Sequence, residues 1–193
     1  MAGASRWVNI RRRADTQAQR PTRAAVRVPR EGGESVRYEG YGPGGVAVMV
    51  DCLTVDRGQL ERSVRRAFLE HGGRLGAAGS VSYLFKRVGV LSYPPATAAA
   101  ELTRLALESG AEEVVTHADT SVEVLTDPLD FGAIRSFLTS RGFAPAIAEV
   151  TWRAATALEL AGAAGAQMLQ LLATLERLDE VCDVYSNAEI AAA

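Results

Sequence analysis

The residue types and spacing that most clearly point to chemistry are arginines near the start of the chain. Residues 1–37 contain nine arginines against three acidic residues, so this segment carries +6 and the remaining residues carry −8. Guanidinium groups neutralise phosphates, and a neighbouring aromatic ring can stack on a base. The candidate nucleic-acid contacts here are Arg6, Trp7, Arg11, Arg12, Arg13 and Arg20. Charge alone leaves open the alternative of a solvated, disordered tail. For Trp7, the alternative to stacking on a base is that it anchors the arm to the body.

A second candidate is the glycine-rich stretch at residues 38–45. Residues 40–45 include four glycines and one proline; Tyr38 precedes them, Tyr41 is among them, and a buried strand follows. Glycine permits positive φ and close backbone approach, so exposed amides could meet phosphate. The candidate contacts are Tyr38, Gly40, Tyr41, Gly42 and Gly44. From the residues alone, a tight structural loop with at least one packed tyrosine is favoured.

Catalytic and metal-binding patterns are absent from the sequence. The two histidines, His71 and His117, are far apart, and no nucleophile elbow or His-Glu-x-x-His pattern occurs. Cys52 and Cys182 form no Cys-x-x-Cys pair. The loop at residues 72–79 lacks the Gly-Lys-Ser/Thr ending of a phosphate loop. We therefore expect no enzymatic activity, no metal and no cofactor.

The pattern of apolar segments bears on the compartment. No apolar stretch follows the basic start as in a signal peptide, and no run is long enough to cross a bilayer. Both cysteines lie in apolar runs, where buried free thiols are the usual state. We expect a cytoplasmic protein with no membrane partner.

Periodicity predicts a mixed α+β chain. The expected strands are 45–55, 81–86, 89–93, 113–117, 121–126, 146–152 and 181–186, with a tight turn at Arg87–Val88. The expected helices are 59–70, 97–109, 127–141 and 167–178, with Thr97 and Asp127 as N-caps and glycines ending the first three.

These elements predict two lobes after a basic arm and linker at residues 1–37. A ferredoxin-like (β-α-β-β-α-β) lobe would comprise 38–95 plus 153–193. An inserted small α/β lobe (α-β-β-α-β) would comprise residues 96–152. A competing interpretation assigns strand 89–93 to the inserted lobe, which then has its own β-α-β-β-α-β order. Periodicity does not decide between them.

Two stretches resemble a known family. Residues 38–45 (Tyr-Glu-Gly-Tyr-Gly-Pro-Gly-Gly), running into strand 46–50, resemble the signature of the YebC/PmpR family, which includes mitochondrial translational activators of cytochrome oxidase. Residues 1–10 resemble the opening of that family, although Ala4 replaces its histidine and Arg11-Arg12 replace its Lys-His pair. Supporting stretches are 71–76, 79–81, 110–114 and 183–187.

The resemblance implies a non-enzymatic, cytoplasmic regulator of gene expression. Members are DNA-binding transcriptional regulators or ribosome-directed translational activators, so the implied partner is DNA, ribosomal or transfer RNA, or the ribosome. The family places an all-helical domain where this chain has only residues 21–37, which implies that this domain is largely missing. The alternative is a protein-interaction or small-ligand-binding regulatory module without nucleic-acid binding. The oligomeric state stays open.

Overall fold

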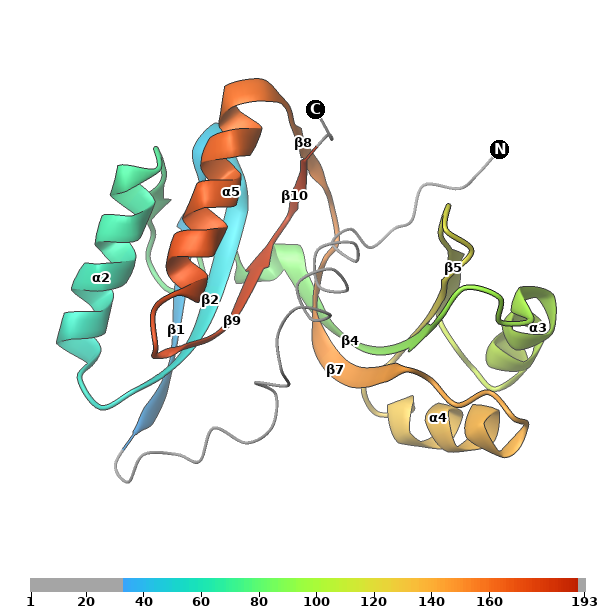
Figure 1. The fold of residues 1–193 in the computed structure, drawn as a ribbon. Helices are drawn as coiled ribbons and strands as arrows, with labels where there is room; N and C mark the ends of the chain where they lie inside the picture. The colour runs from blue at the N-terminus through green and yellow to red at the C-terminus, as the bar shows by residue number, and fades with distance from the viewer. Residues whose placement is uncertain (1–32, 191–193) are drawn as a thin grey trace. The chain divides into compact units, whose positions relative to one another are not determined.

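The computed structural model describes residues 33–190, which form two compact units. We call residues 33–85 with 153–190 the split unit, and residues 86–152 the inserted unit. The N-terminal arm expected from the sequence lies almost entirely outside the described residues. Each unit is described by itself (Figure 1).

The split unit is built on a four-stranded antiparallel sheet in the order β3-β1-β2-β9. Its strands are β1 (Glu34–Tyr41), β2 (Ala47–Thr54), β3 (Arg74–Leu75) and β9 (Val181–Ser186). Helices α2 (Arg57–Glu70) and α5 (Gly162–Glu176) lie side by side on one face of the sheet (Figure 1). Two 3-10 turns, η1 (Pro43–Gly45) and η2 (Ser82–Leu84), and a parallel ribbon of β8 (Leu158–Leu160) with β10 (Ala188–Ile190) complete it.

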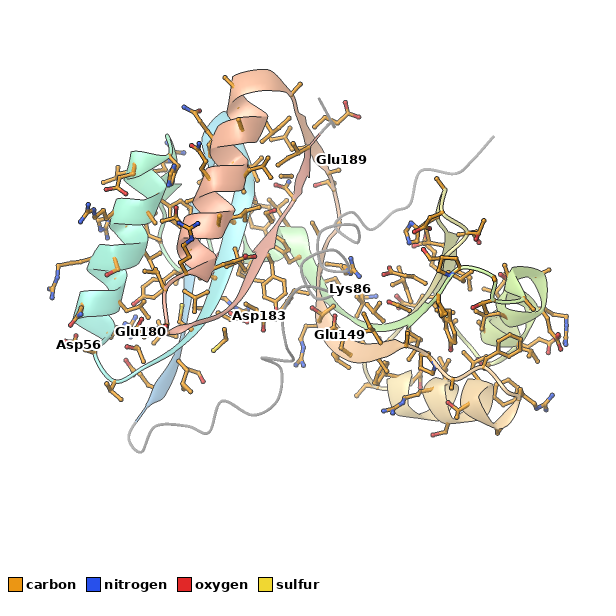
Figure 2. All side chains as sticks on the ribbon, in the orientation of Figure 1. Asp56, Lys86, Glu149, Glu180, Asp183 and Glu189 are labelled. Atoms are coloured by element: carbon orange, nitrogen blue, oxygen red, sulfur yellow. The ribbon has the colours of Figure 1, made fainter. Side chains whose placement is uncertain are left out.

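Alternation along the strands explains this core. Val36 and Tyr38 of β1, and Val48 and Val50 of β2, point to the helix face and pack with Phe68 and its neighbours. Helix α2 begins where the carboxylate of Asp56 accepts the N–H of Gln59 at 2.9 Å, an N-cap visible at the base of the helix (Figure 2). The helix ends at Glu70, and Gly72 in the turn that follows has a φ of 73°, in the left-handed region.

The inserted unit has the element order β-α-β-β-α-β. Its strands are β4 (Phe85–Tyr93), β5 (Glu113–Thr116), β6 (Val122–Thr126) and β7 (Ile147–Ala154), arranged β5-β6-β4-β7. Helices α3 (Ala99–Glu108) and α4 (Phe131–Ser140) contact each other and pack on one face, over Leu91 and Val124. This order and spatial arrangement are those of a ferredoxin-like fold.

The structure therefore corrects the predicted lobes. Strand 89–93 pairs with β6, with Gly89 opposite Thr126 and Tyr93 opposite Val122, so the division falls near residue 86 rather than 96. The ferredoxin-like topology belongs to the inserted unit, whereas the split unit runs β-β-α-β and later β-α-β-β. The competing interpretation of the sequence is the one that the pairing supports.

Local predictions also differ at several points. Residues 85–93 form one continuous strand, so the predicted turn at Arg87–Val88 is wrong; Val88 is fully buried in mid-strand. Thr97 does not cap α3, because its hydroxyl donates to the carbonyl of Pro94. Helix α4 begins at Phe131, four residues later than predicted, because the Asp127 carboxylate holds a turn by accepting the N–H of Leu129.

Candidate nucleic-acid interface

The glycine-rich stretch at residues 38–45 forms the end of β1 and the η1 turn into β2. The turn is closed by the N–H of Gly42, which donates to the carbonyl of Val46 at 2.7 Å. Gly44 and Gly45 have φ of 70° and 82°, in the left-handed region that favours glycine. The stretch is thus a tight connection between two antiparallel strands rather than an open phosphate cradle.

Three of the candidate residues in this stretch are buried. Tyr38 is 6% exposed and its hydroxyl donates to the carbonyl of Arg57 at 3.1 Å. A Cβ on Gly40 would lie 2.6 Å from the carbonyl oxygen of Arg74, and a Cβ on Gly42 would lie 2.8 Å from the sulfur of Met168. Direct nucleic-acid contact by Tyr38, Gly40 and Gly42 is therefore corrected to a packing role, as their burial leaves no surface for a ligand.

Glu39 organises the loop that follows β3. Its carboxylate accepts the N–H groups of Gly79 at 3.0 Å and of Val81 and Ser82 at 2.8 Å each, and its carbonyl accepts the N–H of Gly76. Burial alone would raise the pKa of Glu39, but the three backbone donors together outweigh it and lower the pKa below its usual value. The loop at residues 76–82, which we call the pinned loop, is thereby fixed to β1.

Tyr41 adds a second connection to the pinned loop. Its hydroxyl donates to the carbonyl of Ser80 at 2.8 Å. The guanidinium of Arg74 lies over the Tyr41 ring, 5.2 Å from the centroid. A guanidinium stacked on an aromatic ring is oriented yet keeps its N–H donors available for an anion.

We give the name Arg74 surface to a set of residues in and around the pinned loop: Tyr41, Arg74, residues 76–79 and, in the η2 turn that follows the loop, Tyr83. Arg74 and residues 76–79 are exposed, and Tyr83 is 73% exposed. It offers an oriented cation, a glycine-containing backbone and a solvent-facing ring, which are the groups that contact phosphates and bases. Gly44 is also exposed, at the η1 turn.

The remaining candidate contacts lie outside the described residues. They are Arg6, Trp7, Arg11, Arg12, Arg13 and Arg20. Residues 33–193 hold 13 basic and 21 acidic residues, a net charge of −8. The excess positive charge of the chain is therefore confined to residues 1–32.

Two arginines of α2 are paired with glutamates of the same helix. Arg65 pairs with Glu61 and Arg66 with Glu70, each at 2.7 Å and one helical turn apart. Arg65 and Arg66 therefore belong to a solvated face of paired charges.

Sequence reasoning missed Glu39, Arg74 and Tyr83. Glu39 is an acidic residue on a strand, and its carboxylate binds backbone N–H groups of a loop about 40 residues later in the sequence. Arg74 is a basic residue on the neighbouring strand, opposite the glycine-rich stretch. Neither is visible without knowing that β1 and β3 pair, which places Tyr41 opposite Arg74.

Other site types find no support in the described part of the chain. Among residues 33–190, no three His, Cys, Asp or Glu side chains gather as metal ligands. No helix within that range is long and apolar enough to cross a membrane.

The comparisons identify the kind of protein that carries this architecture. The chain has two α+β units of the type seen in a solved structure, a conserved hypothetical protein from Aquifex aeolicus (TM-score 0.73, 36% identity, 84% of this chain and 67% of that one). The family model described as TACO1/YebC second and third domain matches residues 33–188. The chain belongs to the TACO1/YebC family, as its sequence resemblance predicted.

Curated relatives are similar over the same region. A "probable transcriptional regulatory protein" of Francisella tularensis subsp. novicida (strain U112) is 48% identical over 155 residues, which is 80% of this chain and 62% of the relative. The protein of the same description from subsp. tularensis (strain SCHU S4 / Schu 4) gives the same identity and coverage. The chain thus spans about 62% of the length of these relatives.

Proposed function

We propose that this protein is a non-enzymatic, cytoplasmic regulator of gene expression that binds nucleic acid through its basic arm and the Arg74 surface. The observation that carries the proposal is the exposed Arg74 guanidinium, stacked on Tyr41 beside the pinned loop. The printed description of the relatives, probable transcriptional regulatory protein, favours transcription as the regulated process. Translational activation at the ribosome is the other role that the family resemblance implies.

In this proposal, the arm and the Arg74 surface contribute to binding in different ways. In the arm, the non-specific, salt-dependent attraction to phosphates comes from Arg6, Arg11–Arg13 and Arg20, and Trp7 stacks on a base. The Arg74 surface supplies oriented groups on a fixed backbone, because Glu39 and Tyr41 both hold the pinned loop. A cation held on a rigid element loses less conformational freedom on binding than a free side chain.

A second candidate is a protein-interaction or small-ligand module without nucleic-acid binding. The observation in its favour is the net charge of −8 on residues 33–193, which repels a polyanion. It predicts no nucleic-acid binding at physiological salt, and instead either self-association or a metabolite-dependent shift in melting temperature.

The test is fluorescence anisotropy with labelled duplex DNA and structured RNA, comparing wild type with two variants. Replacing Arg11–Arg13 with alanine should lower the steepness of log Kd against log salt by about 2.7 on DNA. Arg74→Ala should weaken binding about fivefold, the loss expected for one cation contact of about 1 kcal/mol.

Arg177→Ala is the matched control, because Arg177 is an exposed arginine of the same unit at the end of α5. Its binding should equal that of wild type. Equal affinities for Arg74→Ala and Arg177→Ala would remove the Arg74 surface from the interface. If replacing Arg11–Arg13 leaves the slope of log Kd against log salt unchanged, the arm does not contact the nucleic acid.

A further inference from the structure

The side chain of Tyr83 is a large aromatic ring that the split unit holds out into solvent. It is 73% exposed, although the backbone is fixed on both sides of it. The N–H of Ser82 donates to the carboxylate of Glu39 at 2.8 Å. The N–H of Leu84 donates to the carbonyl of Val81 at 2.9 Å and closes η2. Because the turn is already fixed, a flat group that stacks on this ring costs little conformational freedom.

The pinned loop offers backbone donors that the protein itself does not use. Within residues 33–190, the N–H groups of Ala77 and Ala78 meet no acceptor, and both residues are exposed. The loop turns at Gly79, whose φ of 83° lies in the left-handed region. The N–H of Ser80 closes this turn on the carbonyl of Ala77 at 3.1 Å. Backbone amides exposed on such a turn are available to a phosphate oxygen.

The cation and the ring of the Arg74 surface lie within reach of a short strand. The guanidinium of Arg74 lies over the ring of Tyr41, and the hydroxyl of Tyr41 donates to the carbonyl of Ser80. Tyr83 follows Ser80 by three residues, so their Cα atoms are at most about 11 Å apart. A single strand that contacts both Arg74 and Tyr83 therefore needs only a few nucleotides, as in other single-strand sites.

The charges near the loop permit a phosphate to approach. Between Arg74 and Lys86 the sequence contains no acidic residue. Glu39 lies on the neighbouring strand, but it is only 5% exposed and its carboxylate accepts three backbone N–H groups. The negative charge of Glu39 is therefore already compensated by the loop, and Arg74 presents the exposed positive charge.

The split unit as a whole does not favour a duplex. Residues 33–85 and 153–190 hold eight arginines and twelve acidic residues, a net charge of −4. Binding to a duplex comes largely from the neutralisation of several phosphates, and the Arg74 surface has one oriented cation. In a duplex each base is also covered by its neighbours, whereas an unpaired base can stack on an aromatic side chain. The Arg74 surface therefore fits a strand with unpaired bases.

We propose that the Arg74 surface binds unpaired bases of a single-stranded segment of nucleic acid. One base stacks on the ring of Tyr83. A neighbouring phosphate meets the guanidinium of Arg74 and the N–H groups of Ala77 and Ala78. This inference rests on the proposed function and adds the class of ligand to it: the arm attracts any polyanion, and the Arg74 surface selects an RNA loop or opened DNA.

The test measures anisotropy affinities of the full chain for a labelled RNA strand of about 12 nucleotides, the DNA strand of the same sequence, and each strand annealed to its complement. Tyr83→Ala should weaken binding of the single strands at least about fivefold and change duplex binding less than about twofold, because a stacking contact is lost. Tyr83→Phe keeps the ring and should bind as wild type does. Tyr83→Leu keeps apolar bulk without a ring and should behave as Tyr83→Ala does.

Leu69→Ala is the matched control, because Leu69 is another large apolar residue of the split unit and is 64% exposed on α2. It should leave all affinities unchanged. A second readout needs no variant: an unpaired 2-aminopurine base in the single strand should lose fluorescence when wild type binds, whereas the same base inside the duplex should not change.

Equal single-strand affinities of Tyr83→Ala and Leu69→Ala would overturn this inference, and so would an equal weakening of single-strand and duplex binding by Tyr83→Ala. In either case duplex binding by wild type would leave the proposed function standing. If wild type binds none of the probes, the proposed function and this inference are refuted together, and the exposed ring is left to a protein partner. Where the inference holds, the tighter single strand distinguishes an RNA loop from opened DNA.

Discussion

Replacing Glu39 with alanine tests the claim that one carboxylate fixes the pinned loop. The change removes the acceptor of three backbone N–H groups, of which that of Val81 is buried and those of Gly79 and Ser82 are partly buried. An unsatisfied buried donor costs about 1–3 kcal/mol, and the partly buried donors recover some bonding from water. We expect a loss of about 3 kcal/mol in the free energy of unfolding, or roughly 6–12 °C in Tm.

Thermal denaturation followed by circular dichroism measures the loss, and hydrogen exchange localises it. Amides of residues 76–82 should exchange faster in Glu39→Ala. Glu34→Ala is the matched control, since Glu34 is an exposed carboxylate on the same strand, and it should change stability by less than about 0.5 kcal/mol. Equal melting temperatures and equal loop exchange in the two variants would refute the reasoning.

The pKa of Glu39 gives the same contact a pH signature. The folded state lowers the pKa, so the ionised carboxylate is favoured by folding. Its stabilising contribution is fully present above the unfolded pKa of about 4.3 and is lost as pH falls through the folded pKa. Below about pH 4, the amide hydrogens of residues 76–82 should therefore exchange faster in wild type, relative to the same amides of the Glu39→Gln variant.

Further predictions concern packing and reactivity. Gly40→Ala should destabilise the protein by about 1–3 kcal/mol, because a Cβ there would lie 2.6 Å from a backbone carbonyl. Gly132→Ala, in α4 with open space around it, should stabilise the protein by up to about 1 kcal/mol. Urea denaturation of the two variants and wild type measures both changes. Burial raises the pKa of the Cys52 thiol to about 12, whereas Cys182 is exposed. Iodoacetamide at pH 8 should therefore modify Cys182 but not Cys52 in the native chain, and peptide masses identify the labelled residue. Labelling of both cysteines at equal rates would contradict the buried position of Cys52.

Much of the element order was predictable from local pattern. The helices 59–70 and 167–178 and the strand 181–186 carry strong periodicity, and the structure has α2, α5 and β9 there. Strand β1 was missed because glycine and charged residues weaken its pattern. Its close approach to Phe68 requires glycine at position 40, which only the tertiary structure shows.

The division between units was not decidable from the sequence. Whether strand 89–93 belongs to one sheet or the other depends on pairing partners distant in the chain, and local periodicity contains no information about them. The same limit applies to the site. The glycine-rich stretch is evident in the sequence, but which of its residues face solvent depends on the α5 side chain of Met168 and on the β1–β3 register.

The measurement that most directly tests the central claim is the salt dependence of nucleic-acid binding by the wild-type chain. Anisotropy titrations with duplex DNA and with structured RNA should be made from about 50 to 300 mM salt. We predict sub-micromolar binding at the low end that weakens steeply and linearly on a log–log plot, with the tighter probe distinguishing transcription from translation. No binding to either probe at about 50 mM salt would contradict a nucleic-acid-directed function for this chain.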